Sequence, residues 1–406
     1  MSPGTPDWRN SISFSERLQS ILRIQIAYQA SSVRNTSADA QLRAKAVESD
    51  TFATATSKDL YQLLIKNHIH NLEAVVRPVG AISDAELDDD VDQLLAGGIT
   101  IGDYVNASNF KDGQFSTIYK AKSLKRFPSR ERSWKGETVA LKVTSLSAQV
   151  PPHDARKEAR LLAVAASEHV IQLLDTFTAQ SGDFVMVFPL VPLDLDEMLK
   201  RGNMSEDRAK LVTKDLLSAL VHIHGLGMIH RDIKPSNILF QRPNGPACLA
   251  DFGIAWWRDD PACEPSDRKI LDVGTTCYRP PELMFGNESY GPSLDMWATG
   301  CVLAQLFGLG SRTLFDSGDL GSDLALIKSI FETLGTPDLE VWPEAAGYPD
   351  WGKMAFKQYP AKSWSDILPE TSRDARDLIS GLVRYESKDR LIAAEVGTFA
   401  HRAGSR

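Results

Sequence analysis

The sequence predicts an α+β fold with two lobes, a small lobe rich in strands and a larger helical lobe, preceded by a helical extension. From Ile99 onward, short apolar and alternating runs predict strands. After Pro192, apolar residues recur mainly at helical spacing. We therefore expect an extension over residues 1–98, which is helical or partly disordered, a strand-rich lobe over 99–192 and a helical lobe over 193–402.

The extension carries helical patterns and no motif that suggests chemistry. Ser13 and Glu16 form an S-x-x-E capping box at the start of the first pattern. Its apolar residues are Phe14, Leu18, Ile21, Leu22 and Ile26, and those of the second pattern are Tyr61, Leu64, Ile65, Ile69 and Leu72. A Ser/Thr/Ala-rich segment lies between them, and the acidic run Ser83–Asp92 follows. Such a segment either packs on the main domain as helices or remains partly disordered.

The elements of the two lobes follow in order. Strands are expected over Ile99–Ala107, Phe115–Ala121, Thr138–Val143, Val170–Phe177, Phe184–Phe188, Ile238–Phe240 and Cys248–Ala250, with a helix over Asp154–Ala166. The basic stretch Lys122–Lys135 is most simply a solvated hairpin loop. Ser205 should cap a long helix, and Gly225 should end it. The expected buried face of this helix carries Leu211, Leu216, Leu217, Leu220 and Ile223.

The composition argues against several classes of protein. The 406 residues carry a net charge of −8, so nucleic acid is not the expected partner. Four cysteines without a C-x-x-C pair make no disulfide framework and suggest a reducing compartment. No apolar run approaches the roughly 20 residues of a membrane span. We expect a protein of the nucleus or cytoplasm, without a membrane partner.

The segment His230–Asn237, which reads H-R-D-I-K-P-S-N, gathers three groups that suit phosphoryl transfer. The carboxylate of Asp232 can orient a hydroxyl and accept its proton, the ammonium of Lys234 can stabilise a moving phosphate, and the amide oxygen of Asn237 can bind a metal ion. An ordinary polar turn would allow almost any polar residues here, whereas this pattern is typical of a catalytic loop. Asp251, in a D-F-G triplet further along, is the second candidate ligand, for Mg²⁺ that bridges phosphates.

Lys142 lies in an apolar strand and therefore needs an anionic partner. The phosphates of ATP can supply one, and Glu158 in the following helix can supply another. The loop before this strand contains the other nucleotide-contacting candidates, which are Phe110, Gly113, Ser116 and Ile118. Lys111 and Ser116 occupy positions where a phosphate-binding loop has glycine, and side chains there restrict the approach of the backbone to phosphates. Either Lys111 and Ser116 compensate by charge and hydroxyl, or the loop is a plain hairpin that binds ATP poorly.

Over about residues 100–400 these motifs resemble the eukaryotic protein kinases. The resemblance implies a bilobal kinase fold, the use of ATP and Mg²⁺, and transfer to a Ser or Thr hydroxyl of a protein. Other segments are similar to the cyclin-dependent kinase branch. The resemblance implies a hinge at Phe188–Val191, with Phe188 as gatekeeper, Leu190 and Val191 beside the nucleotide, and Asp194 at the ribose position. The other matching segments are Tyr278–Glu282, Asp295–Trp297, Leu334–Asp338 and Trp342-Pro343. The family pattern also implies that Arg390 pairs with Glu282.

The chain departs from that branch at three places. Pro152–Glu158 reads P-H-D-A-R-K-E where the cyclin-contacting helix has P-S-T-A-I-R-E, Ile270 stands at the activating threonine, and Thr275–Cys277 lacks the usual tryptophan. Together with the altered glycine loop, these departures are similar to the fungal monomeric kinases that activate cyclin-dependent kinases. Another cyclin-dependent kinase is then a candidate substrate, a role in cell-cycle or transcription control is implied, and the need for a cyclin stays open.

Two alternatives to an active kinase are a pseudokinase-like interaction module, favoured only by the degraded glycine loop, and a docking role for residues 1–98. For an active kinase we expect constitutive activity. In the family that the chain resembles, an arginine at the position of Arg231 is usually held by a phosphothreonine on the activation loop, whereas Ile270 cannot be phosphorylated. The expected substitutes are Asp267 or Asp272, which would reach Arg231 or a neighbouring basic residue, or phosphorylation of Ser266. The alternative is that both aspartates face water.

Overall fold

A computed structural model describes residues 37–55, 98–113, 116–125, 127, 138–202, 204–319 and 321–396, with separate positions within 17–28 and 58–65. Among the expectations above, the capping box, the acidic run and most of the basic loop lie outside the described residues. The chain divides into two compact units, Met1–Asp88 with Gly318–Gly321, and Asp89–Ser317 with Ser322–Arg406. The expected boundary at residue 98 stays a prediction.

The first unit contains α2 (Ser37–Thr54), which arises in the Ser/Thr/Ala-rich segment where no helix was expected. Its buried residues include Ala44 and Glu48, and Ala44 packs in a small apolar cluster with Ile24, Ala55, Tyr61 and Ile65. The Glu48 carboxylate accepts hydrogen bonds from Arg17 at 2.7 and 2.8 Å and from the Tyr61 hydroxyl at 2.9 Å. The unit therefore has a core of its own with a satisfied buried charge.

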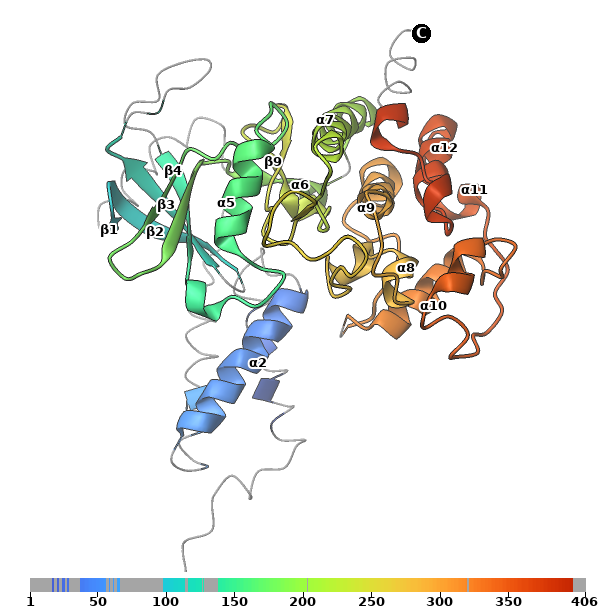
Figure 1. The fold of residues 1–406 in the computed structure, drawn as a ribbon, viewed down its shortest axis with the longest axis horizontal. Coiled ribbons are helices and arrows are strands. Elements are labelled where there is room, and N and C mark those ends of the chain that lie inside the picture. Colours follow the sequence, from blue (N-terminus) through green and yellow to red (C-terminus); the bar gives the residue numbers. More distant parts are fainter. Residues whose placement is uncertain are drawn as a thin grey trace, which may run out of the picture. The chain divides into compact units, whose positions relative to one another are not determined.

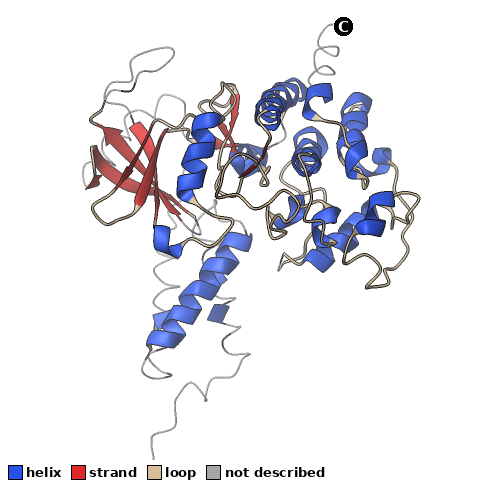
Figure 2. Ribbon diagram, viewed as in Figure 1, coloured by secondary structure: helices blue, strands red, loops and turns tan. Residues whose placement is uncertain are grey.

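In the second unit, the described strands of the small lobe form an antiparallel sheet with the order β1-β2-β3-β4-β6-β5 (Figures 1 and 2). The strands are β1 (Ile99–Ile101), β2 (Tyr104–Asp112), β3 (Ser116–Ser123), β4 (Thr138–Thr144), β5 (Asp175–Thr178) and β6 (Phe184–Pro189). Helix α5 (Ala155–Val164) follows β4 and the short η2 (Leu146–Ala148), and the Asp154 carboxylate caps it by accepting from the amides of Arg156 and Lys157. The six-stranded sheet with helix α5 confirms the strand-rich lobe.

Two expected strands were wrong in detail. Ile99–Ala107 is not one strand, because the chain turns at Gly102, where φ is +58°, and β1 pairs back on β2. The expected strand over Val170–Phe177 begins only at Asp175, and Val170 instead forms an isolated bridge with Leu249.

The larger lobe is mainly helical (Figure 2). Its α-helices are α6 (Leu195–Arg201), α7 (Glu206–Gly225), α8 (Pro281–Met284), α9 (Ser293–Ala304), α10 (Asp323–Leu334), α11 (Trp364–Ile367) and α12 (Arg373–Leu382). Short turns are η3 (Pro235–Asn237), η4 (Thr276–Tyr278), η6 (Pro343–Gly347) and η7 (Ser387–Asp389), and a π-helical turn, η5 (Gln305–Leu309), extends α9. The small strands are β7 (Leu193–Asp194), β8 (Met228–Ile229), β9 (Ile238–Phe240), β10 (Ala247–Leu249) and β11 (Trp256–Trp257).

Helix α7 confirms the Ser205 cap and corrects its expected face. The Ser205 hydroxyl accepts from the Arg208 amide at 3.3 Å. Leu211 is 53% exposed and does not belong to the buried face, which instead includes Val212 and Leu216. The helix ends at Gly225, but the residue with positive φ is Gly227, at +78°.

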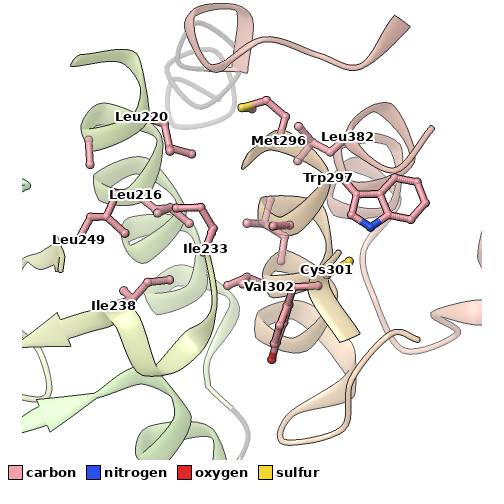
Figure 3. Packing of buried hydrophobic residues seen from close by; sticks show 14 of the residues in the cluster. Leu216, Leu220, Ile233, Ile238, Leu249, Met296, Trp297, Cys301, Val302 and Leu382 are labelled. Atoms are coloured by element: carbon pink, nitrogen blue, oxygen red, sulfur yellow. The ribbon is translucent and has the colours of Figure 1, made fainter. Parts of the chain in front are cut away.

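Apolar packing of α7 against α9 supports the loop that carries the catalytic motif. Figure 3 shows Leu216 and Leu220 of α7 and Val302 of α9 near Ile233. Ile233 is completely buried in this cluster and directly follows Asp232. The loop is therefore anchored in the core of the larger lobe. Among the described residues, no helix is long and apolar enough to cross a membrane.

Candidate active site

Asp232 lies at the centre of a hydrogen-bond network. Its Oδ1 accepts from the backbone amide of Thr275 at 3.0 Å and from the Thr275 hydroxyl at 2.9 Å. Its Oδ2 lies 2.8 Å from Lys234 Nζ and accepts from Asn237 Nδ2 at 3.1 Å. Lys234 also donates to the Thr275 hydroxyl at 2.9 Å. The network brings together the three groups that the motif predicted, and it adds Thr275, which sequence reasoning missed.

The catalytic loop is held in place by Asp295, the first residue of the segment Asp295–Trp297 and part of α9. This carboxylate is fully buried and accepts from the backbone amides of His230 and Arg231, each at 2.9 Å. It also contacts His224 Nε2 at 2.8 Å. Arg231 has a φ of +71°, an unfavourable conformation for a residue with a side chain, and these bonds hold it there. Asp295 thus orients the loop without reaching the reacting groups.

Lys142 of β4 binds two carboxylates that come from distant parts of the chain. Its Nζ lies 2.7 and 2.9 Å from the two oxygens of Glu158 on α5 and 2.9 Å from Oδ1 of Asp251. Burial opposes the charged form of Lys142, but Asp251 and Glu158 outweigh burial and raise the pKa of the ammonium. The positive charge of Lys142 in turn lowers the pKa of Asp251. The expected pairing of Lys142 with Glu158 is present.

Asn237 and Asp251 lie on neighbouring segments and offer oxygen atoms that suit a hard cation. The backbone amide of Ala250 donates to the carbonyl of Asn237 at 2.9 Å, which brings the two segments together. The side-chain nitrogen of Asn237 donates to Asp232, so the side-chain oxygen is the atom left to bind a cation. No group of three or more His, Cys, Asp or Glu side chains in the described chain could hold a metal ion. A Mg²⁺ ion would suit this sparse set, because it commonly combines one or two protein ligands with substrate phosphates.

The altered glycine loop forms the tight hairpin between β2 and β3. The amide of Gly113 donates to the carbonyl of Ser116 at 2.7 Å, and a Cβ at Gly113 would lie 3.1 Å from that oxygen. In the β3–β4 register, Ile118 is paired with Lys142. Phe110, Ser116 and Ile118 are half-buried. Ser116 and Ile118 therefore lie on β3, the strand next to that of Lys142, and Phe110 lies on β2, one strand further away.

At the hinge, Leu190 and Val191 are half-buried and follow β6 directly. Asp194 is buried and accepts from the amide of Glu197 at 2.9 Å, so it caps α6. Lys111 Nζ lies 3.5 Å from Asp194 Oδ2. One of the two loop substitutions thus contacts the residue expected at the ribose.

In the segment after Asp251, Arg231 pairs with Glu264, and not with Asp267 or Asp272. Arg231 Nη1 and Nη2 lie 3.0 and 3.3 Å from the two oxygens of Glu264. Asp272 lies 3.5 Å from Arg279, a neighbouring basic residue, but its side chain is 97% exposed. Asp267 is exposed as well, so the alternative that both aspartates face water describes them better. Burial alone would raise the pKa of Glu264, but the hydrogen bonds and charge of Arg231 outweigh it and lower that pKa.

The expected pair of Arg390 and Glu282 is present and completely buried. Arg390 Nη1 and Nη2 donate to the two Glu282 oxygens at 2.5 and 2.7 Å. Arg390 also donates to the carbonyls of Ser293, Arg384 and Tyr385. We call the segment from Asp251 to Glu282 the activation segment, and this pair joins its end to the last part of the lobe.

A two-lobed fold whose strand lysine binds a helix glutamate, next to a loop with aspartate, lysine and asparagine, defines a phosphotransferase of the kinase class. Residues 106–399 match the family described as Protein kinase domain, and the chain belongs to this family. The chain is 36% identical to serine/threonine-protein kinase csk1 of Schizosaccharomyces pombe over 262 residues, which cover 64% of this chain and 84% of that protein. It is 35% identical to cyclin-dependent kinase 7 of Xenopus laevis over 291 residues, or 70% and 76% of the two chains. It is 31% identical to cyclin-dependent kinase 20 of Danio rerio over 290 residues, or 70% and 78%.

These relatives support the cyclin-dependent branch of the serine/threonine kinases. The chain is accordingly a serine/threonine protein kinase that resembles cyclin-dependent kinases, uses ATP with a divalent metal ion and acts on protein substrates. Neither these relatives nor the catalytic residues described above favour the pseudokinase-like alternative.

Proposed function

We propose that Asp232 orients the Ser or Thr hydroxyl of a protein substrate and accepts its proton, while Lys234 stabilises the transferred phosphate. The support is a set of contacts with the Asp232 carboxylate. Lys234 and Asn237 contact its Oδ2, and the Thr275 hydroxyl donates to its Oδ1. These donors fix the carboxylate before the substrate arrives, which lowers the cost of orienting it in the transition state.

Lys142 is proposed to bind the phosphates of ATP, with Glu158 keeping its ammonium in place. Phe110, Gly113, Ser116, Ile118, Leu190, Val191 and Asp194 are the proposed nucleotide contacts. Asn237 and Asp251 are the proposed ligands of Mg²⁺, which when bound would neutralise charge on the phosphates. The observation that carries this proposal is the contact of Lys142 with both Glu158 and Asp251, because it joins the phosphate-binding and metal-binding groups in one cluster.

The proposed substrate is another cyclin-dependent kinase, phosphorylated on its activation loop. The support is the combination of Ile270, the P-H-D-A-R-K-E helix segment and the altered glycine loop, which is similar to that of fungal activating kinases. A role in cell-cycle or transcription control and activity without a cyclin belong to the same proposal.

The test is phosphorylation by the purified full chain with radiolabelled ATP. The substrates are a catalytically inactive cyclin-dependent kinase, its variant with alanine at the activation-loop threonine, and myelin basic protein. We expect label on the first substrate and not on the second, with Mg²⁺ supporting the reaction and EDTA abolishing it. Asp232→Asn should lower the rate by about 10²–10⁴-fold. Equal labelling of the threonine and alanine substrates would refute the proposed substrate, and unchanged turnover in Asp232→Asn would refute the proposed catalytic role.

A further inference from the structure

Arg160, on the exposed side of α5, forms a two-pronged ion pair with Asp260 in the segment after Asp251. Arg160 Nε lies 2.7 Å from Oδ2 of Asp260, and Nη2 lies 3.0 Å from Oδ1. The Asp260 side chain is 2% exposed, whereas that of Arg160 is 47% exposed. A carboxylate this deeply buried needs a charged partner, because an unpaired buried charge is strongly destabilising.

Asp260 is itself attached to the structure beside the catalytic loop. Its Oδ1 accepts from the amide of Ala262 at 2.9 Å, and its own amide donates to the carbonyl of Trp257 at 3.2 Å. Trp257 belongs to β11, which pairs with β8, and β8 leads directly into His230. The Arg160 guanidinium is thereby tied to the part of the larger lobe that carries Asp232.

The same helix turns Glu158 toward Lys142. Successive residues of an α-helix are rotated by about 100°, so residues 158 and 160 point in nearly opposite directions. Glu158 is held by Lys142 from the sheet, and Arg160 is held by Asp260 from the larger lobe. Two contacts on opposite sides of a helix restrict its rotation about its own axis, and a rotation of α5 would separate Glu158 from Lys142.

The exposed side of α5 is otherwise suited to water. Arg156 lies over the ring of Phe184, with 5.5 Å from its guanidinium carbon to the ring centre. Within α5, the large hydrophobic side chain that is exposed is Val164, at 41%. This side of α5 offers a partner helix little apolar surface. Arg160, on the same side, is already paired with Asp260 of this chain.

We propose that Arg160 and Asp260 are positioning residues, which hold α5 in the orientation that keeps Glu158 on Lys142 without a second chain on α5. The inference rests on the proposed role of Lys142 and Glu158 in phosphoryl transfer. Arg160 acts through Glu158, and neither member of the pair touches the reacting groups.

The test is a double-mutant cycle on the purified full chain, with kcat and KM for ATP measured in the same assay. Arg160→Gln should lower kcat by roughly tenfold, about the effect of losing one charge-assisted hydrogen bond. In a Glu158→Gln background the same change should cost less than about twofold, because residues that act through one another are not additive. Asp260→Asn should reproduce the loss, and Arg160→Lys should restore part of it. Arg373→Gln, which breaks an exposed ion pair of 3.7 Å in α12, is the matched control.

A kcat within about twofold of wild type in both Arg160→Gln and Asp260→Asn overturns the inference and leaves the kinase assignment intact. Equal losses from Arg160→Gln in the wild-type and Glu158→Gln backgrounds also overturn it, because Arg160 would then act independently of Glu158. If Arg160→Gln does not fold, Asp260→Asn and Arg160→Lys, each alone and with Glu158→Gln, decide by the same criterion. Failure of the wild-type chain to transfer phosphate would contradict the proposed function instead.

Discussion

Glu264 accepts hydrogen bonds from both terminal nitrogens of Arg231, at 3.0 and 3.3 Å, in the position where the activation segment passes the catalytic loop. The Arg231 side chain is fully buried. Around this pair, the Trp256 indole donates to the Glu264 carbonyl at 2.8 Å, and the Tyr290 hydroxyl donates to the carbonyl of Ile270 at 2.7 Å. The activation segment is thus ordered by a permanent carboxylate and by hydrogen bonds from Trp256 and Tyr290.

The first prediction is that activity does not require phosphorylation and depends on Glu264. Removing its charge by Glu264→Gln weakens a charge-assisted contact of about 1.5–3 kcal/mol, so we expect kcat to fall by roughly ten- to hundredfold. The chain is expressed in a host without eukaryotic kinases, its unmodified state is confirmed by mass spectrometry, and kcat is measured. Asp267→Asn, an acidic residue of the same segment outside the Arg231 pair, is the control with unchanged activity.

The same prediction has a pH dependence. Because Arg231 lowers the pKa of Glu264, the stabilisation from their pair is present above the ordinary glutamate pKa of about 4.3 and is lost as the pH falls below it. Protease resistance of the activation segment should therefore stay constant between pH 6 and 8. A phosphate, whose second ionisation lies near pH 6, would make it vary in this range. An unmodified chain that is inactive and gains activity only when Ser266 or another loop hydroxyl is phosphorylated would contradict the prediction.

Lys142→Arg should abolish phosphoryl transfer and leave the fold intact. The ammonium lies within 2.9 Å of both Glu158 and Asp251, and the planar fork of arginine cannot reproduce a point charge between them. The measurement is kcat together with the thermal midpoint. Lys200→Arg, in the partly exposed pair with Asp196, is the control for the substitution itself. Substantial activity in Lys142→Arg would mean that the cluster tolerates a different cation geometry.

Ser116→Gly should tighten ATP binding. Ser116 stands where phosphate-binding loops have glycine, and removing its side chain lets the backbone come closer to the phosphates. The measurement is KM for ATP, supported by direct binding of a non-hydrolysable ATP analogue. Ser123→Gly, at the other end of β3, is the control for flexibility introduced into that strand. An unchanged or higher KM in Ser116→Gly would contradict the prediction, and a higher one would show that the hydroxyl helps to hold the nucleotide.

Sequence patterns predicted the groups whose position depends on short, contiguous motifs. Asp232, Lys234 and Asn237 meet because one tight loop carries all three. Lys142 meets Glu158 because its strand and the helix α5 are close neighbours along the chain. Glu264 and Asp260 could not be found this way, since their partners depend on the path of an irregular segment through space. The sequence shows that this segment carries acidic residues, but only its path in the folded chain shows that Glu264, and not Asp267, pairs with Arg231.

The expected buried face of α7 was wrong at Leu211, which the helical repeat itself separates from Leu216. A spacing of 3.6 residues places Val212 within about 40° of Leu216 and Leu211 about 140° from Leu216, although Val212 and Leu211 are both apolar. In the structure, α7 contacts β8 and β10, and Leu211 stays 53% exposed. The turn at Gly102 was missed because Ile99–Ala107 is apolar enough on both sides of the glycine to read as one strand.

Breaking the pair of Glu282 and Arg390 should destabilise the larger lobe more than any exposed ion pair. Both side chains are completely buried, and Arg390 lies over the Trp297 ring with its guanidinium carbon 5.0 Å from the ring centre. Glu282→Gln leaves the arginine charge without its counter-ion, and such a loss costs about 3–5 kcal/mol of unfolding free energy. Urea unfolding followed by tryptophan fluorescence measures it. Asp377→Asn, which removes the exposed partner of Arg373, should change stability by less than about 1 kcal/mol. Equal effects of the two substitutions would show that the buried pair contributes no more than a surface one, and that the backbone carbonyls around Arg390 are sufficient to hold it.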